Sequence, residues 1–330
     1  RVLWAFAVNS VIANLDTYNG WYIHNFYLYK TKDGLFQMIP WDLSESFGGA
    51  LMGGVFATPN DIYHFDPFFG NTTSPQSNPL LYTLLNEELY KKQYTAHVRT
   101  IIEESLDTAF LRSQVEDLQN LAYTAANADS YKVFSMADYT SNVEDPLWSF
   151  TAFWGFAGIF ETIDVRKDYL LNHPEITEEP PVISNLTVNN NLVTVEVFNA
   201  NKVELMTTIS EYNSKFSSFN MYDDGSNGDA VAGDNIYACE LPFYNQGEVV
   251  KFYVRAQNDN AMQLDPQSAE YEFYMYAPAS VGVQEQLVLT ERKPVKVVDV
   301  LGREVKGDVY NIPLIYIFDD GTVERELKVR

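Results

Sequence analysis

The spacing of apolar and polar residues divides the chain into a helical part followed by β-rich parts. Residues 1–15 are apolar almost all round, which predicts a buried helix. From Pro79 to about His173, apolar residues recur three and four positions apart, as on the buried side of helices. Beyond Pro181 the period becomes two, which is typical of β-strands.

The β-rich part begins with seven segments of two-residue period, separated by turn residues. Seven short strands of this kind predict an immunoglobulin-like β-sandwich. The expected strands are 182–188, 192–199, 203–210, 218–222, 236–241, 249–256 and 269–276. A smaller all-β module should follow, with strands near 287–289, 295–299, 315–319 and 324–328.

Two proline-containing segments, Thr177–Pro181 and Tyr276–Ser280, have the composition of linkers. They predict three domains, which are residues 1–176, 182–277 and 281–330. The expected fold class is therefore multidomain, with an α+β part followed by two all-β parts.

A β-hairpin is predicted where Phe26–Lys30 and Leu35–Trp41 flank Asp33-Gly34, a strong signal for a two-residue turn. That turn would pair Lys32 with Leu35 and place Asn25 opposite Asp42. Because directly opposite side chains share one face of a hairpin, Asn25 and Asp42 should converge at its open end. Asp16 follows the first helix and can reach the same place.

Helix, aspartate, asparagine, hairpin and second aspartate follow one another in the order of a protein-kinase C-terminal lobe. In that lobe the first aspartate positions the substrate hydroxyl, while the asparagine and second aspartate hold Mg²⁺ against the phosphates. Mg²⁺ prefers such hard oxygen ligands. The alternative is ordinary turn chemistry, since Asp and Asn are common at the ends of hairpins.

Several motifs around the hairpin resemble the CotH kinase family, the relatives of spore coat protein H, which are similar to atypical secreted protein kinases. Ile-Pro-Trp-Asp-Leu is the most specific of them, and the resemblance covers about residues 1–175. The matching segments are Ala13–Tyr18, Asn25–Lys30, Asp33-Gly34, Met38–Leu43, Phe47-Gly48, Asn78–Leu81 and Tyr169–Pro174.

The resemblance implies a catalytic role for Asp16 and Mg²⁺-binding roles for Asn25 and Asp42. It also implies ATP as cosubstrate and a serine or threonine of a protein as acceptor. No glycine-rich phosphate loop or anchoring lysine precedes Asp16. We therefore expect the sequence to be the C-terminal portion of a kinase-like domain, with activity residing in the full-length protein.

A binding protein is the alternative function. It would be a pseudokinase-like surface scaffold, or an adhesion or glycan-binding protein that uses the aromatic loop Phe65–Phe69. The loop residues Asp61, His64 and Asp66 are either substrate or nucleotide contacts or solvated polar residues of a loop. His24, beside Asn25, either contacts substrate or is a half-buried turn histidine.

The segment Tyr222–Asp234 contains four aspartates and three glycines. Asp224, Asp229 and Asp234 could bind Ca²⁺ through their carboxylates. The alternative is a loop of Asx-turns, in which the side chains accept hydrogen bonds from their own backbone.

The C-terminal module resembles a type IX secretion (Por) sorting domain. The matching segments are Val295–Val305, Ile315–Ile317, Gly321 and Glu326–Arg330. The resemblance implies export across the outer membrane by the type IX machinery, and hence a secreted or surface location. A generic β-module is the alternative.

Charge narrows the range of partners. The net charge of −23 repels phosphate backbones and anionic lipids, which argues against nucleic-acid and membrane-surface binding. The sequence contains no run of about 18 apolar residues, so no membrane span is predicted. The single cysteine, Cys239, has no partner for an internal disulfide.

Overall fold

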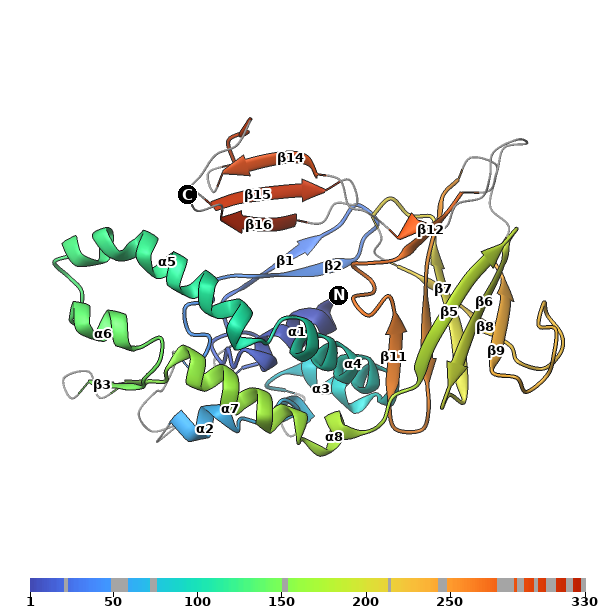
Figure 1. Cartoon of the computed structure of the whole chain (residues 1–330), viewed down its shortest axis with the longest axis horizontal. Coiled ribbons are helices and arrows are strands. Elements are labelled where there is room, and N and C mark those ends of the chain that lie inside the picture. The colour runs from blue at the N-terminus through green and yellow to red at the C-terminus, as the bar shows by residue number, and fades with distance from the viewer. Residues whose placement is uncertain are drawn as a thin grey trace. The chain divides into compact units, whose positions relative to one another are not determined.

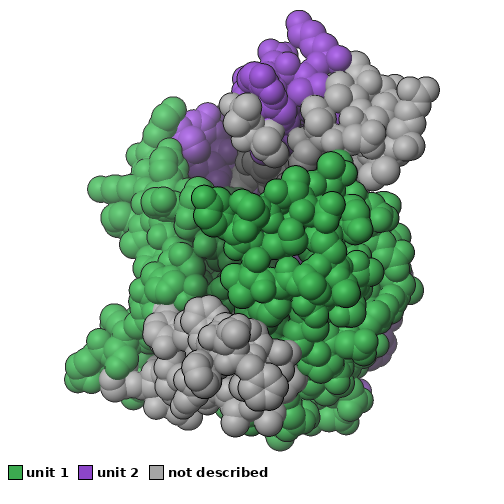
Figure 2. Space-filling model, turned by 90° about the vertical axis from the view of Figure 1, so that its left-hand side faces the viewer, with its two compact units in different colours: residues 1–178 green, residues 179–330 purple. Residues whose placement is uncertain are grey.

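The chain forms two compact units, residues 1–178 and 179–330, which are coloured separately in Figure 2. The first unit is mainly helical and the second consists of antiparallel sheets, so the protein is α+β overall (Figure 1). This computed structural model describes residues 1–20, 23–48, 59–71, 76–149, 154–212, 215–242, 248–277, 288–289, 294–299, 302–306, 313–318 and 323–327.

The first unit has an apolar core between α1, α4 and α7, as its helical pattern predicts. Phe6, Val98, Ile102 and Leu170 are all fully buried in this core. The helices are α1 Val2–Val11, α2 Pro59–Tyr63, α3 Pro79–Asn86, α4 Glu88–Glu104, α5 Thr108–Ala128, α6 Met136–Ser141, α7 Ile159–Leu171 and α8 Pro174–Thr177, with a 3₁₀ helix, η1, at Phe69–Asn71.

The helical prediction is wrong between α6 and α7. Leu147–Ser149 and Trp154–Phe156 form two short antiparallel strands, β3 and β4, and the helix begins only at Ile159. Aromatic residues are frequent in this stretch and favour strands over helices.

A fully buried arginine, Arg166 of α7, holds the first unit together. Its guanidinium donates hydrogen bonds to the carbonyls of Ser10 and Val11 at the end of α1. It also donates to the carbonyls of Ile62 and Tyr63, at 3.2 and 3.0 Å, and to that of Phe65. One side chain therefore supplies donors to the last turn of α1 and to the end of α2, whose carbonyls no helix satisfies.

His97, in the middle of α4, is a second buried polar side chain. Its ring stacks on that of Trp4 with 4.2 Å between centroids, and neither ring nitrogen has a hydrogen-bond partner among the described residues. Burial lowers the pKa of His97 well below its ordinary value. The imidazole is therefore neutral in the folded protein.

This histidine should make the helical unit sensitive to acid. Below about pH 6.5 His97 binds a proton in the unfolded chain but not in the folded protein. The free energy of unfolding therefore falls by about 1.4 kcal/mol for each pH unit below that value. His97→Leu should remove this dependence, for a relative gain of about 2 kcal/mol at pH 5. Urea unfolding between pH 7 and 5, followed by circular dichroism, measures it. A parallel pH dependence in His97→Leu and wild type would contradict it, and exposed His64→Leu is the control.

The hairpin exists as predicted, but its register is different. β1 (Phe26–Lys30) pairs with β2 (Phe36–Pro40) so that Lys30 faces Phe36 and Phe26 faces Pro40. The loop contains three residues rather than two, with Gly34 at φ +88° and its N–H donating to the Thr31 carbonyl. A three-residue loop that ends in a left-handed glycine is a common alternative to the two-residue turn.

The second unit contains two antiparallel sheets that share one apolar core. One sheet has the order β13-β12-β10-β7-β8, with β11 also paired to β10, and the other has the order β5-β6-β9. Val195 from the second sheet and Leu205, Phe252 and Val254 from the first lie fully buried in this core. The strands are β5 Val182–Asn189, β6 Leu192–Phe198, β7 Lys202–Thr208, β8 Ser217–Met221, β9 Ile236–Glu240, β10 Val250–Gln257, β11 Met262–Asp265, β12 Tyr274–Tyr276 and β13 Val288–Leu289.

Two strand predictions need correction here. The strand expected at 269–276 begins only at Tyr274, because the chain turns through Pro266 and Ser268, whose carbonyls accept from the N–H groups of Ala269 and Tyr271. β11 was not predicted. β13, expected in the C-terminal module, pairs with β12 instead.

The C-terminal strands form a separate antiparallel sheet of the order β14-β15-β16. They are β14 Pro294–Asp299, β15 Pro313–Phe318 and β16 Val323–Leu327, close to the predicted positions. Gly321 and Arg330, which contribute to the sorting-domain resemblance, lie outside the described residues. Among the described helices, none has both the length and the apolar character that crossing a membrane requires.

Candidate functional site

The loop that carries Asp16 is fixed by side chains that bind the backbone of α1 and of the loop itself. Asn14 Nδ2 donates to Asn9 Oδ1 at 3.1 Å, and Asn14 Oδ1 accepts from the Asp16 N–H at 3.2 Å. Asn19 Nδ2 donates to the Phe6 carbonyl at 3.1 Å. These asparagines are buried, and their hydrogen bonds hold the backbone at Asp16 in a fixed position.

Two consecutive residues before β1 contact the Asp16 carboxylate. Asn25 Nδ2 donates to Asp16 Oδ2 at 2.9 Å, and His24 Nε2 lies 2.7 Å from Asp16 Oδ1. The Asp16 side chain is only 15% exposed, whereas that of His24 is 52% exposed. The structure thus brings Asp16 and Asn25 together and adds His24 as a direct contact of the carboxylate.

Asp42 follows β2 at the open end of the hairpin, and it does not lie opposite Asn25 as predicted, but one position past the residue that does. The residue opposite Asn25 is Trp41, whose N–H donates to the Asn25 carbonyl at 3.0 Å. A shift of one residue would reverse the face of a continuing strand. Asp42 is not part of the strand, however, because its φ of +45° turns the chain, just as φ +56° does at Asn25. Asn and Asp accept this left-handed conformation more readily than most residues.

Asp42 is exposed and ionised. Hydrogen bonds from Ser44 lower the pKa of its carboxyl group, and the charge of His24 lowers it further. Because His24 also contacts Asp16, both aspartates lie within electrostatic reach of the same imidazole.

Glu45 is an acidic residue near this group that the sequence did not single out. Burial is the main cause that raises the pKa of the Glu45 carboxyl group, and the negative charges of Asp16 and Asp42 raise it further. The chain turns sharply after the hairpin, with the Ser46 N–H donating to the Leu43 carbonyl and the Phe47 N–H to that of Ile12. This turn brings Glu45 close to the two aspartates. The sequence contains no local motif that predicts the turn.

The polar residues of the following loop contact the end of α7. Asp66 Oδ1 accepts from the Phe68 N–H at 2.7 Å and lies 3.5 Å from His173 Nε2. The His64 ring packs edge-on against Tyr169. Asp61 lies in the first turn of α2. These contacts fit a structural role in the loop.

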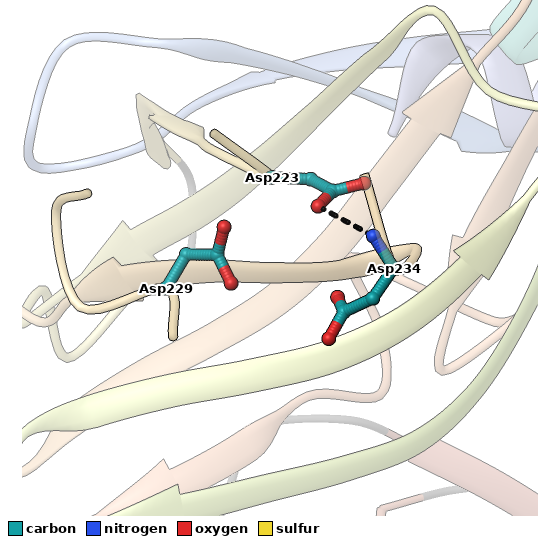
Figure 3. A group of neighbouring side chains, drawn as sticks. All are labelled: Asp223, Asp229 and Asp234. Atoms are coloured by element: carbon teal, nitrogen blue, oxygen red, sulfur yellow. Dashed lines mark hydrogen bonds between the residues drawn. The ribbon is translucent and has the colours of Figure 1, made fainter. Parts of the chain in front are cut away.

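The acidic loop of the second unit brings three aspartates together, but not the three that were predicted. Carboxylate oxygens of Asp223, Asp229 and Asp234 lie within 4.8 Å of one another (Figure 3). Asp224 instead accepts from the N–H and Oγ of Ser226, at 2.9 and 2.6 Å. Its side chain serves the local turn, and Asp223 takes its place in the group.

Backbone hydrogen bonds occupy this group of carboxylates. Asp223 accepts from the N–H groups of Gly233, Asp234 and Asn235, at 2.6, 3.2 and 3.0 Å. Asp229 accepts from Gly225 at 2.6 Å and from Val231 at 3.2 Å. This is the pattern of a self-capping loop, and Ca²⁺ binding stays a prediction.

Asp223→Ala should lower the stability of the second unit by about 2 kcal/mol, because three backbone N–H groups lose a charged acceptor at once. Asp224→Ala removes contacts to Ser226 only and should cost less than half as much. Urea unfolding followed by near-ultraviolet circular dichroism measures both. Equal losses in the two variants would show that Asp223 does not organise the loop.

Residues 2–150 match the family model described as CotH kinase protein. The matched region contains α1, the Asp16 loop, the hairpin with Asn25 and Asp42, and the helices α2 to α6. No match was found among the curated proteins or among the solved structures. The comparisons give no support to the immunoglobulin-like and sorting domains, which stay predictions.

Proposed function

We propose that the full-length protein is a secreted or surface kinase that transfers the γ-phosphate of ATP to a serine or threonine of a protein. The observation that carries the proposal is the contact between Asp16 and Asn25, with ionised Asp42 following the partner strand at the same open end of the hairpin. The match of residues 2–150 to the CotH kinase family model supports it.

The donor atoms fit Mg²⁺. Because Asn25 Nδ2 donates to Asp16, its Oδ1 is the atom left for a cation, and Asp42 offers carboxylate oxygens. Mg²⁺ bound to these two oxygens would neutralise charge on the phosphates.

Asp16 would position the acceptor hydroxyl. As the hydroxyl oxygen bonds to the γ-phosphorus, the bond from that phosphorus to the β-phosphate oxygen breaks, and ADP departs. The hydroxyl proton passes to Asp16. His24 and Asn25 hold one carboxylate oxygen each, which fixes the orientation of the group before the substrate arrives.

Transfer of labelled γ-phosphate by the full-length protein with Mg²⁺ tests the proposal. Wild type should label a protein acceptor, and Asp16→Ala and Asp42→Ala should each abolish the labelling. A folded wild type that neither binds ATP nor transfers phosphate would overturn the kinase and favour the scaffold.

One observation favours a binding protein as the second candidate. The face of the hairpin that carries Tyr27, Tyr29, Ile39 and Trp41 is about half exposed, and the rings of Tyr27 and Trp41 pack edge to face at 5.4 Å. Exposed aromatic faces often mark binding surfaces. The loop Phe65–Phe69 is less suited to glycans, because Phe68 is buried in the core. A glycan array, with Trp41→Ala as comparison, tests this function.

For export, we propose the type IX machinery as partner. The proposal depends on the sequence resemblance of residues 281–330 to a sorting domain. Within the matching segment, Arg303 Nε donates to Asp299 Oδ2 at 2.7 Å, and Gly302 has φ +78°. Deletion of residues 281–330 should retain the protein inside the cell, and unchanged export would refute the assignment.

A further inference from the structure

The first unit contains a cavity of about 360 Å³ between α5, α6 and the β3–β4 hairpin. Its volume lies in the range of small-molecule sites. Phe134 and Phe156 form part of its wall, with perpendicular rings 5.2 Å apart. The lining also includes Ala126, Asp129, Lys132, Met136, Asp138 and Tyr139.

Hydrogen bonds hold the walls of the cavity in place. Gln119 Nε2 of α5 donates to the Tyr139 carbonyl at 2.7 Å, and the Tyr139 hydroxyl donates back to the Gln119 carbonyl at 2.8 Å. Asn142 Nδ2, at the end of α6, donates to the Ala157 carbonyl just after β4 at 3.1 Å. The cavity is therefore formed before any ligand arrives, which favours binding.

Two carboxylates face the cavity, and local contacts use only one oxygen of each. Asp129 Oδ1 accepts from the Tyr131 N–H at 2.8 Å. Asp138 Oδ2 accepts from the N–H and Oγ of Ser135, at 2.9 and 2.7 Å, in the capping box that starts α6. Among the described residues, Asp129 Oδ2 and Asp138 Oδ1 have no recorded hydrogen bond.

The one lysine of the lining does not neutralise both carboxylates. Lys132 Nζ donates to the Asn127 and Asp129 carbonyls, at 2.9 Å each, at the C-terminal end of α5. A cation at this end of a helix is stabilised by the helix dipole. The lining therefore combines an apolar wall, a bound ammonium and a surplus negative charge.

We propose that this cavity binds an organic cation with an apolar body, such as an aryl or alkyl amine. The apolar body would lie against Phe134, Met136 and Phe156, and the ammonium would reach the open oxygens of Asp129 and Asp138. The same chemistry is available from a free amine or from a lysine side chain of a peptide. The proposal is independent of the kinase function, because it uses none of the residues at the hairpin.

Ligand titration tests the charge preference. Phenethylamine, the neutral 2-phenylethanol and the anionic phenylacetate are added in turn, and the methyl resonance of Met136 is followed by nuclear magnetic resonance. The amine should bind about tenfold more tightly than the alcohol, and phenylacetate more weakly still. Equal affinities for all three, or a preference for phenylacetate, would overturn the proposal.

Variants locate the site. Asp129→Asn keeps an oxygen for the Tyr131 N–H and should weaken amine binding about fivefold. Ala126→Leu should block the cavity, and Asp117→Asn, on the exposed side of α5, should change nothing. A lysine-containing peptide and the same peptide with norleucine in place of lysine separate the two sources of the ammonium. A site for peptide lysines should bind the lysine peptide more tightly than the norleucine peptide, whereas a site that admits only free amines should bind neither. Amine binding that survives both Asp129→Asn and Ala126→Leu would place the ligand elsewhere and overturn the proposal.

Discussion

Arg166→Met is expected to lower the free energy of unfolding of the helical unit by about 3–5 kcal/mol. Arg166 is 1% exposed and donates to five backbone carbonyls, from α1 and from the end of α2. Methionine has a similar length but no donor, so all five carbonyls would lose the guanidinium, and among the described residues only those of Ser10 and Ile62 would keep a backbone N–H donor. Burial already lowers the pKa of Arg166 to about 10, which still leaves it charged at neutral pH.

Urea unfolding followed by circular dichroism at 222 nm reports mainly on the helices and measures this loss. Lys167→Met, at the next position of α7, is the matched control and should cost less than about 1 kcal/mol. Arg166→Lys should fall between the two, because one ammonium cannot reach all of the carbonyls. An Arg166→Met variant as stable as the Lys167→Met control would show that the carbonyls find other partners.

Asp42→Asn should reduce phosphate transfer by the full-length protein about a thousandfold or more. The amide keeps the size and one oxygen of the side chain but loses the negative charge. The hydrogen bond from the Ser44 N–H can persist, so the local fold should survive. The loss should appear in kcat rather than in stability, because Asp42 is exposed and contributes little to packing.

Asp33→Asn, at the opposite end of the same hairpin, is the matched control. Asp33 accepts a hydrogen bond from Thr31 Oγ1 within the turn, and an asparagine can keep this contact. The phosphate-transfer activity of the Asp33→Asn variant should therefore stay within about twofold of wild type. An Asp42→Asn variant that retains a tenth or more of wild-type kcat would remove Asp42 from the reaction.

The sequence predicted the local elements of the hairpin well but not its register. The apolar segments on either side of Asp33-Gly34 did form strands. The loop length depended on whether Lys32 belongs to the strand or to the turn, and both arrangements suit an Asp-Gly pair. Asp16 was expected only to reach the open end of the hairpin, and in the structure its carboxylate accepts from Asn25, a contact that depends on the end of α1 more than on strand pairing.

The residues that sequence reasoning missed are those whose position depends on distant or irregular backbone. Glu45 reaches the aspartates through a turn after β2 that carries no recognisable signal. Asp223 belongs to the acidic group because it captures N–H groups ten to twelve positions away, whereas Asp224 satisfies its own turn. Spacing alone does not separate two neighbouring aspartates with such different partners.

The most direct test of the hairpin site is a titration of the ¹⁵N-labelled protein with Mn²⁺ and ADP, followed by nuclear magnetic resonance. A paramagnetic ion held by Asn25 and Asp42 should broaden the side-chain amide of Asn25 and the indole of Trp41 first, and Asp42→Asn should abolish this broadening. If the Asn25 amide keeps its intensity while signals of the Asp223 loop or none at all are lost, the hairpin does not hold the metal.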